Sequence, residues 1–425
     1  MSDRCTVASL VAFIVIAIGF LCLLPNQMLA DEYVHWPQAL RFAHGDWLVD
    51  PWLSTWPTMN FAVSLLLRLF QSDQLWVGRL TIIAFAVLAY VGFVQLIDAL
   101  HEPSPQYHRV RGIMALQWFT CPLLLLFCTV VYTDIPALAA LIWAAVGVAE
   151  RRRGLFLIAG IATVAFRQTH LLWFATLLAW HLLLAWRAQT ANIHAPTMAR
   201  LISLVRGERL TLIVSATAVL AWLAVVVHTG AIAFGVNTQP AHHMSVGGVP
   251  NEFFAMVVWM TAFAPIAIGT LATLVTRQFS RRETLITVGV AAIVAVLASV
   301  FFVTTQLGNT HPSAMILIRN QALQALTDPF GRPLLIALCA AGALVWWRIE
   351  FAPSVAPFKW PFFLASASYL LPFSLIEQRY YLPMFTLLAA FRVPLTSRWE
   401  WAQLAWSLAL SSVLLYHVIY KGRFL

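Results

Sequence analysis

The sequence contains few charged residues. Only 10% of its 425 residues are Asp, Glu, Lys or Arg, whereas an average soluble domain is about a quarter charged. Hydrophobic residues make up 61% of the chain. This balance excludes an ordinary soluble domain and places the protein in a lipid bilayer.

Several motifs of soluble chemistry are also missing. The five cysteines are an odd number and form no Cys-x-x-Cys pair, so neither a disulfide framework nor a zinc finger is expected. The chain has no G-x-G-x-x-G, no Walker lysine motif and no D-x-D string. These absences argue against ATP-driven transport and against a glycosyltransferase that binds a nucleotide sugar through a divalent ion.

Apolar runs, by contrast, recur from end to end. Each is about 20 residues long, which is enough for a helix to cross the hydrocarbon core. We predict an all-α polytopic membrane protein with roughly 13 transmembrane helices and a single domain over residues 1–425. The first span is expected at residues 6–28, retained rather than cleaved. The others are centred near residues 88, 121, 141, 160, 177, 219, 263, 295, 340, 367, 387 and 411.

The arginines and lysines fall mainly in alternate connections between these runs. Examples are Arg151-Arg152-Arg153 and the connection with Arg187, Arg200, Arg206 and Arg209. Basic connections mark the cytoplasmic side, so the N-terminus is expected in the cytoplasm. The net charge of +9 therefore reflects membrane topology and does not indicate a nucleic-acid partner.

Chemically reactive side chains gather in the connections on the opposite, non-cytoplasmic face. They are Asp31, Glu32, His35, Asp50, Tyr132, Asp134, Arg167, Gln168, His242, His243, Glu377 and Arg379. Charged groups at the ends of apolar helices are expensive and are functional candidates by default. This topology predicts one active face.

The first of these connections, residues 29–58, carries an acid pair and four tryptophans. Its start has apolar residues near helical spacing, which predicts an amphipathic helix at the membrane interface. An aromatic belt explains the tryptophans. The belt does not explain Asp31 and Glu32. Either carboxylate could take a proton from an attacking hydroxyl, or both could be charges at a helix end, and the residues alone leave this open.

Four stretches in order carry a resemblance to a known family. They are "DEYVHWPQALRFAHGDWLVDPWLSTWP" from residue 31, "YTD" from 132, "FRQTHLLW" from 166 and "LIEQRYYLP" from 375. Together they resemble the dolichyl-phosphate-glucose-dependent α-1,2-glucosyltransferases of asparagine-linked glycosylation. The chain departs from that pattern at Asp134, where the family has Glu, and at His170, where it has Asn. The segment 305–323 matches poorly.

The resemblance implies a GT-C glycosyltransferase fold with an amphipathic first non-cytoplasmic loop at 29–58. It also implies an inverting transfer of a hexose, most simply glucose, from a polyprenyl phosphate to a hydroxyl of a lipid-linked glycan. Asp31 and Glu32 are the expected catalytic acids, and Arg167, Arg379, His242 and His243 the expected ligands of the donor phosphate. His35, Asp50, Tyr132, Asp134, Gln168 and Glu377 are expected to bind sugar or acceptor.

The expected partners are the lipid donor, the lipid-linked acceptor and membrane lipids. The reaction would take place on the luminal face of the endoplasmic reticulum in a eukaryote, or the periplasmic face of the inner membrane in a bacterium. No cofactor is expected, and a divalent metal at Asp31, Glu32 and Asp50 is conceivable but not favoured. Two alternatives stay open: another GT-C enzyme that moves mannose or an aminosugar to protein or lipid, and a transporter or flippase of lipid-linked sugars.

The chemistry also predicts the geometry of the site. A polyprenyl tail is too apolar to leave the bilayer and a glycan too polar to enter it. The first loop and the connections with Arg167, His242 and Arg379 should therefore converge around one cavity that opens sideways to lipid. Asp31 should line this cavity.

Overall fold

The computed structural model describes residues 2–102, 105–189, 197–229, 249–276, 280–304, 307–308, 316–318, 321–371, 373 and 375–421. The first half consists of α1 (Ser2–Leu23), α2 (Glu32–Ala43), α3 (Thr58–Phe70), α4 (Leu75–Leu100), α5 (Pro105–Phe119), α6 (Pro122–Leu125), η1 (Phe127–Thr129), α7 (Asp134–Ala149), α8 (Arg153–Phe166), η2 (Gln168–His170), α9 (Leu171–Gln189), α10 (Thr197–Gly207) and α11 (Arg209–Thr229).

The second half is also mainly helical. It contains α12 (Val249–Ala262), α13 (Ala264–Thr276), α14 (Arg281–Thr304), α15 (Gln321–Ala325), α16 (Arg332–Arg348), η4 (Ala356–Phe358), α17 (Lys359–Leu370), η5 (Gln378–Tyr381), α18 (Leu382–Phe391) and α19 (Ser397–Lys421). Three short strands, β1 (Leu307–Gly308), β2 (Ile316–Ile318) and β3 (Leu375–Ile376), form one parallel sheet in the order β1-β2-β3.

The helices support an integral membrane protein with several spans. Each predicted apolar run forms a helix or a bent pair of helices. In the described part of the chain, six helices are long and apolar enough to cross a bilayer, or up to eight if two bent pairs each count as one span. The pairs bend by 58° between α5 and α6 and by 95° between α12 and α13. The expectation of about 13 complete spans is therefore not confirmed, because several runs form shorter helices.

Three of the short helices begin or end at polar motifs. Helix α7 begins at Asp134, α8 ends at Phe166 just before Arg167, and α18 begins three residues after Arg379. A polar side chain costs least where the helix gives way to a loop, because its neighbours there can hydrogen-bond it. The polar motifs thus shorten these helices and gather at their ends.

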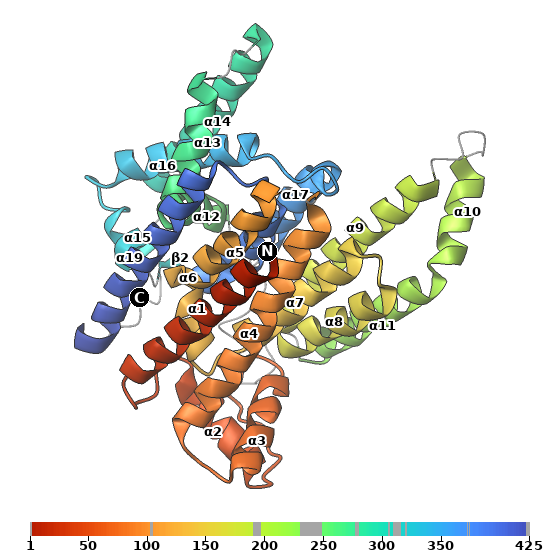
Figure 1. Ribbon diagram of the computed structural model, residues 1–425, viewed down its shortest axis with the longest axis vertical. Helices are drawn as coiled ribbons and strands as arrows, with labels where there is room; N and C mark the ends of the chain where they lie inside the picture. Colours follow the sequence, from red (N-terminus) through yellow and green to blue (C-terminus); the bar gives the residue numbers. More distant parts are fainter. Residues whose placement is uncertain are drawn as a thin grey trace.

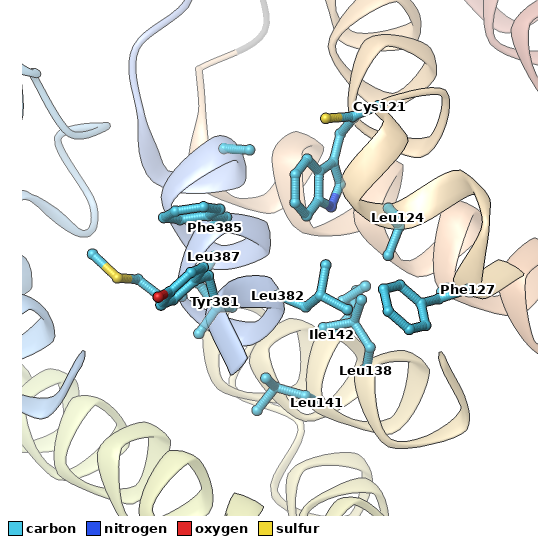
Figure 2. Close-up of a cluster of buried hydrophobic side chains, with 14 of the residues drawn as sticks. Cys121, Leu124, Phe127, Leu138, Leu141, Ile142, Tyr381, Leu382, Phe385 and Leu387 are labelled. Carbon is cyan, nitrogen blue, oxygen red and sulfur yellow. The ribbon is translucent and has the colours of Figure 1, made fainter. Parts of the chain in front are cut away.

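A continuous apolar core holds these helix ends in place. Figure 2 shows side chains of α6, η1, α7 and α18 packed together. Leu138 of α7, Phe127 of η1, and Tyr381 and Leu382 at the start of α18 are all buried in this core. Between helices in a bilayer, such packing is stabilised by van der Waals contact, since lipid tails are as apolar as the side chains. The segments that carry Asp134 and Arg379 are consequently fixed relative to each other.

The first connection contains the helix that its apolar spacing predicts, with one correction to its tryptophans. Residues 32–43 form helix α2, which packs on α3, and Figure 1 shows both at one end of the molecule. Trp47 and Trp52 are exposed, as an interfacial belt requires. Trp36 is instead buried. A Cβ on Gly78 would lie 2.5 Å from its ring, so α4 approaches the indole closely and Trp36 is a core residue.

Candidate functional site

Asp31 and Arg379 form an ion pair at the start of α2. Arg379 Nη1 donates to Asp31 Oδ2 over 2.5 Å, and Arg379 Nε donates to Glu377 Oε2 over 2.7 Å. The side chain of Asp31 is 35% exposed and that of Arg379 is 11% exposed. One guanidinium therefore bridges two carboxylates, and the carboxylate of Asp31 can be reached from outside.

Two tyrosine rings flank the guanidinium. The Arg379 Cζ atom lies 5.7 Å from the ring centroids of Tyr132 and Tyr380. Burial lowers the pKa of Arg379, but the charges of Glu377 and Asp31 outweigh it, and the pKa stays well above its usual value. Arg379 is thus a fixed positive charge. The Tyr132 hydroxyl accepts the backbone N–H of Asp31 over 2.8 Å, which anchors the start of α2.

Glu32 has a different environment from its neighbour. Its side chain is fully buried and pairs with Arg79 of α4, whose side chain is 3% exposed. Arg79 Nη2 and Nε donate to the two carboxylate oxygens over 2.7 and 3.0 Å. The backbone N–H groups of Leu29 and Val131 donate to the same oxygens over 2.9 and 2.8 Å. Four donors hold this carboxylate, so Glu32 joins α2, α4 and the loop before Tyr132.

A further ion pair, which is buried, lies beside the pair of Asp31 and Arg379. Arg167 Nη1 donates to Asp134 Oδ1 over 2.5 Å, and both side chains are buried. The Arg167 Cζ atom lies 5.9 Å from the centroid of the Tyr380 ring. Within the described residues, Arg167 Nε and Asp134 Oδ2 have no hydrogen-bond partner. Buried polar atoms without partners are costly, which points to a polar ligand at this position.

Tyr380 connects the two pairs. Both guanidinium groups lie within cation–π distance of its ring. Asp31 and Arg167 are therefore on the same side of the protein, as the expected convergence requires. Of the predicted site residues, Asp31, Tyr132, Asp134, Arg167, Glu377 and Arg379 come together here. His242 and His243 lie outside the described residues.

His35 lies one helical turn after Asp31 and is buried. Its Nδ1 is 3.4 Å from the Asn60 amide nitrogen, and its ring centroid is 6.1 Å from that of Tyr132. Burial lowers the pKa of His35 to about 4, although the charge of Asp31 opposes this shift. The imidazole is therefore neutral at physiological pH and can offer both a donor and an acceptor.

Asp50 and Gln168 have contacts that fold the first loop. Asp50 Oδ1 accepts the backbone N–H of Trp52 over 2.8 Å, and the backbone N–H of Asp50 donates to Gln38 Oε1 over 2.6 Å. Gln168 Nε2 donates to the carbonyl of Ser54 over 2.7 Å. The segment after α8 is thus tied to the first loop. Sugar binding by Asp50 and Gln168 stays a prediction.

An apolar groove lies between several helices and reaches the residue that precedes Arg379. Gln378, the residue before Arg379, contributes to its lining, together with Pro122, Leu123, Leu126, Phe127, Val258, Thr261, Ala262, Leu323, Leu326, Trp406, Leu410 and Leu414. These residues come from α6, η1, α12, α15, η5 and α19, except Leu126 and Leu326, which directly follow α6 and α15. In the described part of the chain, no group of three or more His, Cys, Asp and Glu could hold a metal ion.

Sequence reasoning missed several residues of this site. Arg79 lies near the start of a long apolar run, a position typical of an interfacial anchor. Its contact with Glu32 is seen only in the fold. Tyr380 was visible in the Arg-Tyr-Tyr motif, but its place between two guanidiniums was not. Asn60 gave no signal, because a single amide in a helix is ordinary. Its amide donates to the carbonyl of His35 over 2.7 Å.

Comparison with known proteins adds one finding. A family model described as "DIE2/ALG10 family" matches residues 25–390, which is most of the chain and includes Asp31, Asp134, Arg167 and Arg379. Searches of curated proteins and of solved structures found no match.

Proposed function

Because the chain belongs to the DIE2/ALG10 family, the dolichyl-phosphate-glucose-dependent α-1,2-glucosyltransferases of N-glycosylation, we propose that Asp31 and Arg379 are the centre of its transfer reaction. Family membership makes the protein a membrane glycosyltransferase of lipid-linked oligosaccharide synthesis. The observation that carries the proposal is the ion pair between a partly exposed carboxylate and a buried guanidinium within the matched region.

The proposed reaction is a single inverting displacement. A hydroxyl of the lipid-linked glycan attacks C1 of glucose, and the bond from C1 to the phosphate oxygen of the polyprenyl phosphate breaks. The hydroxyl proton passes to the Asp31 carboxylate, and the phosphate takes the bonding electron pair. Arg379 stabilises the negative charge that develops on the phosphate. No metal or cofactor is required to balance these changes.

Arg379 links donor binding to activation of the base. In the structure its guanidinium is shared by Asp31 and Glu377. A donor phosphate bound to the same guanidinium competes with both carboxylates, since their oxygens and those of a phosphate suit the same fork of N–H groups. A carboxylate that loses its cation is a stronger base. Donor binding would therefore activate Asp31.

The second ion pair supplies groups for the phosphate and the sugar. We assign Arg167 Nε to the phosphate and Asp134 Oδ2 to a glucose hydroxyl, because both atoms are buried without a partner in the described residues. The buried Tyr369 hydroxyl lies close to the Arg167 side chain and adds a further polar group here. Its ring centroid lies 6.2 Å from that of His170, next to this region. Neutral His35, with Tyr132, faces the acceptor side of Asp31.

The apolar groove beside Gln378 suits the donor tail. A polyprenyl chain remains in lipid while its phosphate reaches Arg379, and an apolar path next to this residue meets both needs. Glu32 takes a positioning role, because four donors occupy its carboxylate. The proposed face is luminal in the endoplasmic reticulum, or periplasmic in a bacterium.

Transfer from defined donors tests the proposal. Purified protein is incubated with polyprenyl phosphate carrying labelled glucose or labelled mannose and with a panel of lipid-linked glycans. The expected result is a new glycosidic bond with inverted anomeric configuration, formed from the glucose donor. Transfer of mannose alone would instead support another GT-C enzyme. Movement of the intact donor across a vesicle membrane without bond cleavage would support a flippase.

Asp73 offers a matched control for the base. It is an acid that follows α3 and is exposed, with its carboxylate 3.2 Å from His44 Nε2. Asp73→Asn removes the same charge as Asp31→Asn, but away from the ion pairs. Transfer should survive in Asp73→Asn and be lost in Asp31→Asn. Equal activity in both variants would remove Asp31 from the mechanism.

A further inference from the structure

Helix α10 (Thr197–Gly207) joins α9 and α11 at the end of an arm. Figure 1 shows α9, α10 and α11 projecting from the body, with α10 in yellow-green at the far end. The stretch Gln168–Gln189, which includes α9, and the stretch Arg209–His228 of α11 are both candidate membrane spans. A short helix that connects the same ends of two spans lies near the membrane surface.

That surface is opposite the ion pairs. The span that contains α9 begins at Gln168, next to Arg167, and runs for 22 residues. A helix of this length rises about 33 Å, close to the hydrocarbon thickness of a bilayer. Helix α10 follows the far end of this span. It is therefore on the membrane face opposite Arg167.

The surface of α10 is divided into an apolar and a polar side. Met198, Leu201, Ile202 and Val205 are all exposed. At 100° per residue they fall on one side of the helix, while Arg200 and Ser203 fall on the other and Arg206 lies at the edge of the apolar stripe. An exposed apolar stripe backed by arginines is the pattern of a helix that lies in a membrane interface.

The junction between α10 and α11 is anchored to the body. Glu208 is buried, and its carboxylate accepts from Arg153 Nη2 over 2.6 Å and from Thr211 Oγ1 over 3.1 Å. It also lies 2.9 Å from His181 Nε2. Arg153 Nη1 donates to the carbonyl of Gly207 over 3.2 Å. These contacts to α8 and α9 limit rotation of α10 and keep its apolar stripe directed outward.

We propose that α10 lies in the membrane interface opposite the reaction centre and binds anionic phospholipid headgroups. The apolar stripe enters the acyl region, while Arg206 and Arg209 contact headgroup phosphates. Both arginines are exposed, and their charge complements an anionic leaflet. If α10 lay in water, four large apolar side chains of one short helix would be exposed to it. In the membrane interface these side chains contact lipid acyl chains. The inference is independent of the sugar-transfer proposal.

Accessibility measurements test the depth of α10. Cys5 and Cys22 are exposed and free, so Cys5→Ser/Cys22→Ser provides the background. Ile202→Cys and Ser203→Cys each receive a nitroxide label in full-length protein in phosphatidylcholine vesicles that contain phosphatidylserine. Collisions with oxygen should dominate at position 202, and collisions with a water-soluble paramagnetic complex at position 203. Preference for the water-soluble complex at both positions would overturn the proposal.

Retention of phosphatidylserine tests the headgroup contacts. Native mass spectrometry of the full-length protein measures the lipid bound as its concentration is raised. An arginine near an anionic surface contributes a factor of about five, so Arg206→Gln/Arg209→Gln should weaken retention by roughly 25-fold. The control, Arg281→Gln/Arg282→Gln, removes two exposed arginines at the start of α14. Equal losses in both variants would mean diffuse attraction to any basic loop and would overturn the proposal.

Discussion

Two adjacent residues, Asp31 and Glu32, belong to two very different regions of this protein. The region around Asp31 is open: its carboxylate is 35% exposed and shares Arg379 with Glu377. The region around Glu32 is closed, because its carboxylate is fully buried and its oxygens accept from Arg79 and from two backbone N–H groups. Successive residues at a helix start point about 100° apart, so one turn of α2 serves both regions.

The difference fits the proposed roles, in which Glu32 holds a position and Asp31 takes a proton. A carboxylate that accepts from four donors has no accessible lone pair for a proton. A partly exposed carboxylate that shares its guanidinium with a second acid can be released when a phosphate takes its place. The closed region also sets the geometry of the open one, because Glu32 accepts from Val131, the residue before Tyr132. Tyr132 in turn accepts the backbone N–H of Asp31.

The largest expected effect is the loss of turnover in Asp31→Asn. The amide keeps the size of the side chain but cannot take a proton, so kcat should fall by about 10²–10⁴-fold. The thermal unfolding midpoint in detergent should change little, because the side chain is partly exposed. Initial rates of glucose transfer measure the fall in kcat, and an unfolding curve of the same preparation measures the midpoint. Near-normal rates would place the reaction centre elsewhere.

Glu32→Gln should chiefly affect stability. It leaves the Arg79 guanidinium buried opposite a neutral amide, and breaking a buried ion pair in this way costs about 3–5 kcal/mol. Chemical or thermal unfolding of the purified protein measures the loss. Asp46→Asn is the matched control, since its carboxylate is 43% exposed and pairs with Arg41, which is 35% exposed, so its removal should change stability little. Similar losses of unfolding free energy in both variants would contradict the assignment of Glu32 to a closed region.

Acid should destabilise the protein through His35. The pKa of His35 is about 4 in the folded protein against 6.5 for the exposed group, so the unfolded chain binds more protons between these values. Stability therefore falls as pH decreases from about 6.5 toward about 4, by up to roughly 3 kcal/mol from this residue. Unfolding of the wild type and of His35→Gln across this pH range measures the difference. If His35→Gln loses as much stability with falling pH as the wild type, other groups cause that loss.

The smallest expected effect concerns the shape of the cation at position 379. Arg379→Lys keeps the charge but replaces the planar fork with a single ammonium group. We expect about a tenfold loss in kcat/KM, seen mainly as a higher KM for the polyprenyl-phosphate donor. Arg398→Lys is the control, as Arg398 is exposed next to Trp399. An unchanged KM in Arg379→Lys would argue against a phosphate at this guanidinium.

The sequence predicted the helical membrane character and most of the residues that meet at the site. It singled out the charged residues at helix ends that the structure brings together, namely Asp31, Asp134, Arg167 and Arg379, and their roles stay predictions. These charged groups are costly among apolar runs, so their presence alone was informative. The family resemblance read from four motifs is confirmed by the family model over residues 25–390.

The roles within the acid pair could not be predicted. Nothing in the sequence shows that Arg79 faces Glu32 and not the membrane surface, because this depends on the crossing of α2 and α4. The prediction that Trp36 lies at the interface was wrong for the same reason. An indole in an amphipathic pattern suits an interface, yet Gly78 leaves room for this one in the core. The expected number of complete spans is not confirmed in the described residues, because hydropathy does not register where a polar motif ends a helix.

The small parallel sheet connects a distant part of the chain to the ion pair of Asp31 and Arg379. Strand β2 pairs with β3 so that Ile318 lies opposite Ile376, and Ile376 immediately precedes Glu377. Backbone hydrogen bonds make the two strands share one conformation, so a ligand that stabilises one strand also stabilises the other. By thermodynamic reciprocity, a donor at Arg379 and an acceptor that contacts β2 would then each increase the affinity for the other by the same factor.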